Sequence, residues 1–218
     1  MSLLSHQFPE LDGFQSCLCG RNRSFKRHSD LFIQIINRSP TGKGSHWITV
    51  SNLKALDLSK DIVVYDSAYT DIPHEQGLVI ASLVDIKSDV LNVHFANVQM
   101  QRNAYDCGFF AIANAITLAF GQNPANQTYD ARQMRSHLIG CLENKTMTKF
   151  PVVRFSGKRK SIKKSIAIEI FCLCRLPDTN ELYVFCDECS SEFHPECVNI
   201  TKPITNSMKF TCPKCLIK

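Results

Sequence analysis

The sequence predicts a mixed α+β fold with a second, smaller module at its C-terminal end. Four apolar runs with strand-like patterns precede one run that is apolar nearly all round, as in a buried helix. Seven of the eleven cysteines cluster with a histidine after residue 170. A chain of 218 residues, of which 44% are hydrophobic, is long enough for one domain with a real core and a small one beside it.

The larger part divides into short elements separated by turn residues. Pro40 to Gly44 is typical of a tight turn and predicts a hairpin between the first two strands. Apolar residues between 78 and 86 recur at roughly helical spacing, whereas those of 91–96 alternate as in a half-buried strand. We therefore expect strands at 31–36, 45–50, 61–67 and 91–96, and helices at 73–86, 109–120 and 130–141.

Cys107 stands directly before the predicted buried helix. The polar stretch 101–106 leads into this cysteine, and the apolar run that follows ends at Gly121. At a helix N-terminus the unpaired backbone N–H groups and the helix dipole favour a thiolate. The same N–H groups can hold a developing oxyanion. The alternative is a buried structural cysteine, which is the commoner role of a lone thiol.

Three other residues complete a candidate catalytic set with Cys107. His46 stands at the start of one predicted strand and Asp66 at the end of another. A cysteine attacks well when an imidazole takes its proton, and a carboxylate orients that imidazole. The side chain of Gln101 adds a second donor for an oxyanion. His74 and His94 are nearby in sequence, and we expect both to be surface polar residues.

The residues around this set resemble a known family. The motifs are His46-Trp47, Tyr65-Asp66-Ser67 and Gln101-x-Asn103-x-Tyr105-Asp106-Cys107-Gly108. They resemble the ubiquitin-like-protein-specific cysteine proteases, which include the SUMO proteases and the adenoviral protease. The resemblance covers about the first 150 residues, although the chain ahead of His46 is shorter than is usual in the family.

This resemblance implies a papain-like or adenoviral-protease-like fold for residues 1–150. It also implies His46 as the base, Asp66 as its orienter, Gln101 as the oxyanion donor and Cys107 as the nucleophile. The implied activity is that of a cysteine peptidase or isopeptidase without a catalytic cofactor. Its substrate would be a conjugate of a ubiquitin-like modifier or a polyprotein.

The cysteines after residue 170 follow the spacing of metal ligands. Eight soft ligands in four pairs fit two tetrahedral zinc ions, each closed by four protein ligands and therefore structural. Short intervals within the pairs and long intervals between them suit an interleaved arrangement. One ion would be bound by Cys172, Cys174, His194 and Cys197, and the other by Cys186, Cys189, Cys212 and Cys215.

This module, residues 169–218, resembles a PHD finger, and Phe210 before the last cysteine pair is part of the resemblance. RING domains share the interleaved pattern but differ in ligand order and spacing. The resemblance implies binding of a histone tail, for which acidic residues of the module are suitable. Phe171 and Tyr183 occupy cage positions, but Glu192 stands where trimethyl-lysine readers often have tryptophan. We therefore expect no preference for trimethyl-lysine.

The formal net charge of +5 arises from the segment between the two parts. Residues 149–168 carry seven basic side chains and no acidic one. We interpret 151–168 as a flexible basic linker and as a nuclear-import signal or phosphate-binding patch. The run Lys158 to Lys164 has no interleaved aromatic residue for base stacking, so import is favoured over nucleic-acid contact.

Two functional hypotheses follow. The first is an active cysteine peptidase directed to chromatin by its zinc finger, in the nucleus. The second is a non-catalytic chromatin-binding protein whose protease-like part is only a scaffold. The sequence contains neither a secretory signal nor a long apolar span, which favours a reducing intracellular compartment and no membrane partner.

Overall fold

A computed structural model describes most of the chain. The described residues are 1–21, 24–28, 30–38, 46–53, 61–154, 162–176, 183–201 and 209–217. The turn predicted at 40–44 and the basic residues 158–160 lie outside them. Within these ranges, no helix has both the length and the apolar character that a bilayer crossing requires.

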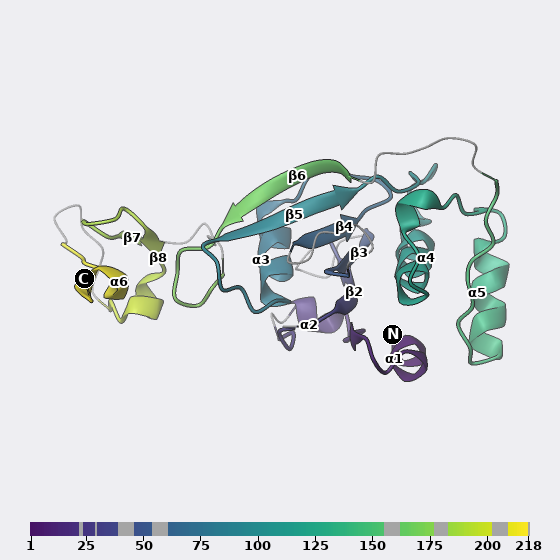
Figure 1. The fold of residues 1–218 in the computed structure, drawn as a ribbon, viewed down its shortest axis with the longest axis horizontal. Coiled ribbons are helices and arrows are strands. Elements are labelled where there is room, and N and C mark those ends of the chain that lie inside the picture. Colours follow the sequence, from purple (N-terminus) through teal and green to yellow (C-terminus); the bar gives the residue numbers. More distant parts are fainter. Residues whose placement is uncertain are drawn as a thin grey trace.

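A six-stranded mixed sheet forms the centre of the larger part (Figure 1). Its strands are β1 (Asp12–Gly13), β2 (Phe32–Asn37), β3 (Trp47–Ser51), β4 (Ile62–Tyr65), β5 (Val90–Ala96) and β6 (Ile162–Glu169). They lie side by side in chain order. The pairs β1–β2 and β4–β5 are parallel, and the other three pairs are antiparallel. The expected hairpin of β2 and β3 is present.

Helices cover both faces of this sheet. Helix α3 (His74–Ser82) lies on one face, and α4 (Cys107–Ala119) lies on the other, packed against β2 and β3 (Figure 1). Helix α5 (Met134–Glu143) packs outside α4. The short helices α1 (Ser2–Gln7) and α2 (Leu18–Arg21) flank the first strand.

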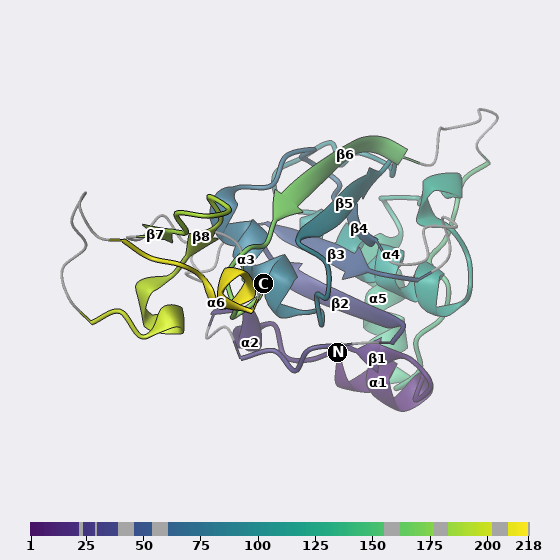
Figure 2. The same ribbon diagram turned by 60° about the vertical axis from the view of Figure 1, so that its left-hand side comes forward.

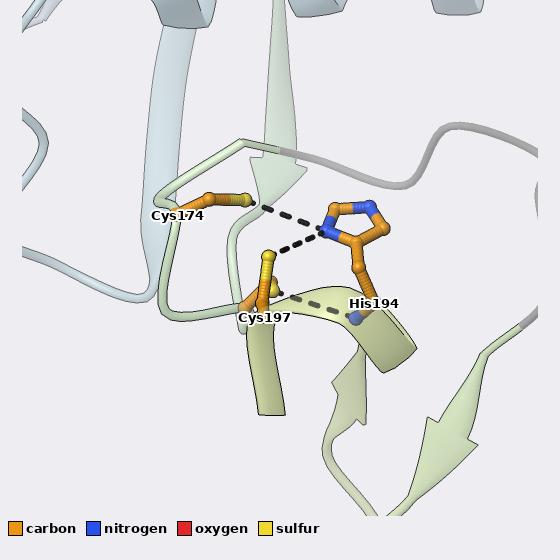
Figure 3. A group of neighbouring side chains, drawn as sticks. Cys174, His194 and Cys197 are labelled. Carbon is orange, nitrogen blue, oxygen red and sulfur yellow. Dashed lines mark hydrogen bonds between the residues drawn. The ribbon is translucent and has the colours of Figure 1, made fainter. Parts of the chain in front are cut away.

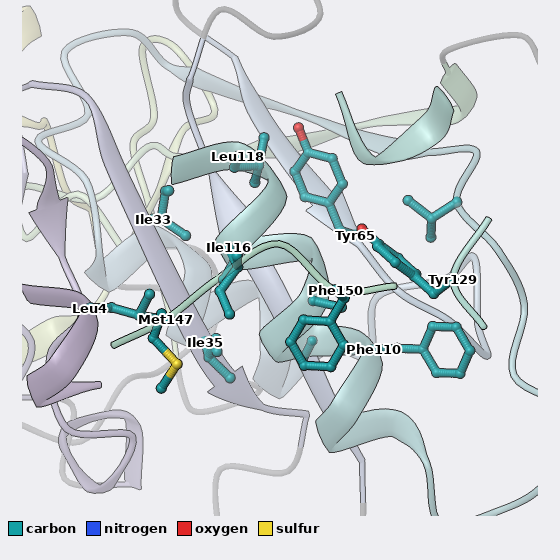
Figure 4. Packing of buried hydrophobic residues seen from close by; sticks show 14 of the residues in the cluster. Leu4, Ile33, Ile35, Tyr65, Phe110, Ile116, Leu118, Tyr129, Met147 and Phe150 are labelled. Atoms are coloured by element: carbon teal, nitrogen blue, oxygen red, sulfur yellow. The ribbon is translucent and has the colours of Figure 1, made fainter. Parts of the chain in front are cut away.

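The side chains of β4 alternate between the two cores. Val63 and Tyr65 belong to the cluster of α4, while Ile62 and Val64 belong to the cluster of α3. Successive side chains of a strand point to opposite faces, so a strand covered on both faces is apolar throughout. Figure 4 shows the first of these clusters, in which Ile116 of α4 packs with strand residues.

The helix predicted at 109–120 is present as α4, which begins two residues earlier and ends one residue earlier. Cys107 is its first residue, and Gly121 follows its end with a positive φ of 69°. The N–H of Gly121 donates to the carbonyl of Leu118 at 2.8 Å, and that of Gln122 donates to Thr117 at 2.9 Å. This pair of bonds is a Schellman motif, which requires a left-handed residue at the glycine position. The central helix is therefore terminated by its own sequence.

Helix α5 begins later than the predicted residue 130, a position at which Asp130 would have been its N-terminal cap. The helix begins at Met134, after Gln133, and no side chain caps it. Asp130 instead accepts from the backbone N–H of Arg132 at 3.1 Å and from the side chain of Gln133 at 2.7 Å. Its carboxylate therefore stabilises the turn that precedes the helix.

The flexible linker predicted at 151–168 is wrong for its second half. Residues 162–169 form β6, which pairs antiparallel with β5 from Val90 to Ala96. Ile166 and Ile168 pack against the core on the α3 face, and Lys163 and Lys164 are exposed. Lysines on an edge strand are a usual protection against pairing with other chains. Figure 2 shows β6 at the edge of the sheet, running toward the C-terminal module.

The C-terminal module has few elements and a small core. It contains β7 (Val184–Phe185), β8 (Glu192–Phe193), a 3-10 helix at Pro195–Val198 and α6 (Pro213–Leu216). β7 and β8 form an antiparallel pair. Val184 and Phe193 are buried together with three cysteines. Such a core is too small to hold the module by apolar burial alone.

The module is docked on the sheet domain by several hydrogen bonds, most of them at residues 86–89. Asp89, just before β5, accepts from Arg175 at 3.0 Å and from Lys214 at 3.0 Å. Arg175 also donates to the carbonyls of Ile86 and Ser88. The hydrogen bond from Lys214, with that from Arg175, holds the pKa of Asp89 below its ordinary value. The two parts are thus in direct contact. One contact residue, Arg175, follows the ligand Cys174, and the other, Lys214, precedes the ligand Cys215.

Candidate functional site: a Cys–His–Asp group and two zinc centres

The sheet brings His46 and Asp66 together. His46 directly precedes β3 and Asp66 directly follows β4, and these strands pair antiparallel, with Thr49 opposite Tyr65. The start of β3 and the end of β4 therefore meet at one edge of the sheet. The Nε2 atom of His46 lies 2.7 Å from Oδ1 of Asp66, and both residues are buried.

The carboxylate of Asp66 is fixed by its own loop. Its Oδ1 accepts from the backbone N–H groups of Ala68 at 2.8 Å and Tyr69 at 2.9 Å. An ionised carboxylate can accept hydrogen bonds but cannot donate them. The imidazole nitrogen that faces Asp66, Nε2, therefore carries the proton of this contact. The nitrogen that remains for proton transfer on His46 is therefore Nδ1.

Cys107 lies at the start of α4 with only 3% of its surface exposed. This end of the helix packs on β3. Thr49 donates its hydroxyl to the carbonyl of Ala111 at 2.6 Å. A Cβ atom built on Gly108 would lie 3.7 Å from Cδ1 of Trp47. Gly108 follows Cys107 and Trp47 follows His46, so the start of α4 lies close to the start of β3.

Gln101 is attached to the loop that follows Asp66. Its backbone N–H donates to the carbonyl of Ser67 at 2.8 Å, and its side-chain oxygen accepts from the Ser67 hydroxyl at 2.7 Å. Its Nε2 donates to the carbonyl of Asn103 at 2.6 Å. An amide nitrogen has two N–H donors, so this arrangement leaves one for another acceptor. The contacts with Ser67 and Asn103 hold the side chain in one orientation.

Asn103 shapes the turn into the helix, a role that sequence analysis missed. Its side-chain oxygen accepts from the N–H groups of Tyr105 at 3.1 Å and Asp106 at 2.9 Å. Its amide nitrogen donates to the Asp106 carboxylate at 2.7 Å. Asparagine commonly bonds its own backbone two residues on, so an asparagine in a short polar loop before a helix was the available signal.

His94 is bound elsewhere. It is half-buried on β5 and contacts Asp61 at 3.0 Å and Ser165 of β6 at 2.7 Å. Cys141 lies on α5, is buried, and contacts His137 at 3.5 Å. His94 and Cys141 thus have partners of their own. Only the backbone of His74, the first residue of α3, is described by the structure.

The C-terminal module brings its eight candidate ligands into the two predicted sets. In each set the possible ligand atoms lie within 4.8 Å of one another. Nδ1 of His194 is 3.4 Å from Sγ of Cys174 and 3.9 Å from Sγ of Cys197, and all three side chains point to one centre (Figure 3). Tetrahedral ligands at about 2.3 Å from zinc are roughly 3.8 Å apart, so this separation fits one ion. The set is Cys172, Cys174, His194 and Cys197.

The second set fits zinc equally well. Sγ of Cys189 and Sγ of Cys212 are 3.8 Å apart. Burial opposes ionisation of Cys186, but backbone N–H groups directed at its sulfur, beginning with that of Cys212, lower its pKa to about 6. Zinc binds the thiolate, so a preformed anion suits the site. The set is Cys186, Cys189, Cys212 and Cys215.

A family model described as PHD-finger matches residues 172–215. These residues are a PHD finger. The finger binds two structural zinc ions, for which the two ligand sets have the required composition and spacing. Because each set supplies four protein ligands, neither ion has an open position for catalysis.

Two curated relatives match the chain over a segment of about the length of the finger. The chain is 41% identical over 49 residues to nucleosome-remodeling factor subunit NURF301 of Drosophila melanogaster, which covers 22% of this chain and 2% of that protein. It is 38% identical over 48 residues to COMPASS component SPP1 of Saccharomyces cerevisiae, which covers 22% of this chain and 14% of that protein. The chain thus spans a small part of the length of these relatives.

Among solved structures, the chain is similar to "SUMO protease Ulp1 with the catalytic cysteine oxidized to a sulfonic acid". The similarity covers 66% of this chain and 73% of that chain, with 19% identity and a TM-score of 0.48. These values are too low to establish a shared fold. The larger part is a mixed α/β domain with a mixed sheet.

Proposed function

We propose that the protein is a cysteine peptidase or isopeptidase that acts on conjugates of a ubiquitin-like modifier or on a polyprotein, and that its PHD finger directs it to chromatin. The observation that carries the proposal is the 2.7 Å contact between His46 and Asp66 beside a helix that begins with Cys107. The domains proposed are a peptidase domain at 1–150, extended by β6, and the finger at 169–218.

In the proposed reaction, His46 Nδ1 takes the proton of the Cys107 thiol, and the thiolate attacks the carbonyl carbon of the scissile bond. The first backbone N–H groups of α4 and the free N–H of Gln101 bind the oxyanion. The imidazolium, stabilised by Asp66, then gives its proton to the leaving amine. Water hydrolyses the resulting thioester and restores the free thiol.

A suicide probe tests this proposal directly. A SUMO vinyl sulfone carries an electrophile at the C-terminus of the modifier, where an attacking thiol forms a stable thioether. We expect one probe per chain, attached to Cys107. Absence of labelling by SUMO and by related modifier probes would favour the second candidate, a non-catalytic chromatin-binding protein. That candidate is supported by the names of the relatives, which are subunits of a nucleosome-remodeling factor and of COMPASS.

The finger is proposed to bind an unmodified or weakly methylated histone tail more tightly than a trimethylated one. Glu192 of β8 lies opposite Phe185 of β7, and side chains of directly opposed residues share one face of the pair. Tyr183 lies two residues before Phe185, which places it on the same side. A carboxylate in this group can pair with an ammonium that still has N–H donors, whereas trimethyl-lysine has none and favours an aromatic wall.

Calorimetric titration with both peptides checks this prediction, using the zinc-loaded full chain. We expect weaker binding of the trimethylated peptide by the parent protein. In Glu192→Trp the preference should shift toward that peptide, and Glu192→Gln separates loss of charge from gain of the ring. Tighter binding of the trimethylated peptide by the parent would contradict the prediction.

A nuclear location is also proposed, on the basis of the basic run. Lys163 and Lys164 lie on β6, whereas residues 158–160 lie outside the described residues. Replacing Lys158, Arg159 and Lys160 by alanine is expected to move a fluorescent fusion from nucleus to cytoplasm. The double variant of Lys163 and Lys164 is the matched control, because a paired strand is a poor ligand for an import receptor. A triple variant that stays nuclear would assign the run a different role.

A further inference from the structure

Tyr69 lies between the candidate base and an arginine. Its ring meets the imidazole of His46 edge to face, with centroids 5.0 Å apart and planes at 89°. The guanidinium carbon of Arg38 lies 3.9 Å from the centroid of the same ring. A cation over the face of a tyrosine and an aromatic ring at right angles to it are both attractive arrangements. Tyr69 thus makes two specific contacts at once.

Arg38 is itself held in place. Its NH2 donates to the carboxylate of Asp71 at 2.8 Å and to the Asp71 carbonyl at 3.3 Å. Its backbone N–H donates to the carbonyl of His46 at 2.9 Å. Only 16% of the Arg38 side chain is exposed. The arginine therefore connects the strand that carries His46 to the loop that carries Tyr69.

The loop 66–71 is tied to the same group from its other end. The backbone N–H of Tyr69 donates to Asp66 Oδ1, the atom that also contacts His46. Tyr69 consequently touches both members of the His–Asp pair, one through its backbone and the other through its ring. Tyr69 as a residue remains 45% exposed, so its ring depends on the guanidinium to stay against the imidazole.

We propose that Tyr69, clamped by Arg38, is a positioning residue that holds the plane of the His46 imidazole. One hydrogen bond to Asp66 leaves the imidazole free to tilt about that contact. The edge-to-face contact with the Tyr69 ring opposes this tilt and so fixes the direction of Nδ1. The inference rests on the proposed function, because it assigns Nδ1 the task of taking the Cys107 proton.

The test compares Tyr69→Ala with Tyr69→Phe in the zinc-loaded full chain. A positioned proton transfer contributes about 10²- to 10⁴-fold, and a misoriented imidazole should lose part of it, so we expect kcat of Tyr69→Ala to fall roughly 10- to 100-fold with KM changed less than about twofold. Tyr69→Phe keeps the ring and should keep the rate. Arg38→Ala should lower kcat less than Tyr69→Ala. The double variant should be no slower than Tyr69→Ala, because Arg38 acts through the ring.

A second readout does not depend on peptidase activity. The rate at which iodoacetamide alkylates Cys107 at neutral pH, followed by peptide mass spectrometry, reports how well the imidazole supports the thiolate. We expect this rate to fall in Tyr69→Ala and to be retained in Tyr69→Phe. If the parent cleaves no substrate but this pattern holds, the proposed function fails and the positioning role stands.

Two outcomes would overturn the positioning role. The first is an unchanged kcat and alkylation rate in Tyr69→Ala. The second is a loss of activity that Tyr69→Phe does not restore, or that appears only in KM, since either would assign Tyr69 to substrate contact. Thermal unfolding of each variant shows whether a lost rate reflects a lost fold.

Discussion

Replacing Cys107 by alanine is expected to abolish peptidase activity and leave the fold intact. Removal of a nucleophile from a comparable catalytic group lowers turnover by about 10⁶-fold, and no other group can form the thioester. Cys107 is the first residue of α4, where alanine supports the helix and removes only a sulfur atom. Cleavage of a modifier conjugate, with circular dichroism as the check on folding, measures both effects.

Cys141→Ala is the matched control for this variant. Cys141 is also buried on a helix, but it lies on α5 and contacts His137. We expect it to retain the parent rate. A Cys107→Ala protein that cleaves as fast as the parent would remove Cys107 from the reaction, and with it the proposed function.

Gln101 provides a graded companion measurement. Gln101→Ala removes the N–H donors without placing a charge beside the oxyanion, so it should lose the oxyanion contact. One such donor is typically worth about 10²- to 10³-fold in turnover. A rate equal to that of the parent would leave Gln101 with the loop contacts to Ser67 and Asn103 alone.

Removal of zinc is expected to unfold the PHD finger and to spare the core around α4. Structural zinc is worth ~10–16 kcal/mol per site in finger peptides, far more than the small core of Val184 and Phe193 can supply. Cys212→Ala, at a ligand with no exposed surface, should lower the zinc content of the chain from two ions to one or none. Hydrogen exchange should then rise across 172–215.

The docking of the finger on the sheet defines how far this unfolding spreads. Arg175 and Lys214 both bind Asp89, so loss of the finger should also raise exchange at residues 86–89. Exchange within α4, which packs on the opposite face, should stay slow. Cys17→Ala is the control, because Cys17 belongs to neither ligand set. Two tightly bound zinc ions in Cys212→Ala would contradict the assignment of the second site.

The docking contact has a defined pH dependence. The pKa of Asp89 is lower in the folded protein than in the unfolded chain, mainly through its hydrogen bond from Lys214. Its contribution is therefore present above its ordinary pKa and is lost as the pH falls through the lowered value. The group is exposed, so solvent screening keeps this contribution small. The contact of Asp89 with the finger is thus weaker in acid than at neutral pH.

The sequence by itself determined the features that depend on neighbouring residues. The zinc ligands could be assigned to two sets because their spacing allows few other arrangements. The helix that begins at Cys107 and ends before Gly121 follows from an apolar run with a glycine at its end. The pairing of β2 with β3 follows from a short turn between two apolar strands.

Only the tertiary structure decided the contacts between distant residues. The charge of Lys163 and Lys164 indicated a linker, but pairing with β5 makes that segment a strand, because the alternating Ile166 and Ile168 gain a core to bury against. The ring of Tyr69 and the guanidinium of Arg38 meet at His46 only after the sheet has formed. Local pattern determines elements, whereas the folded sheet determines which side chains from separate elements become neighbours.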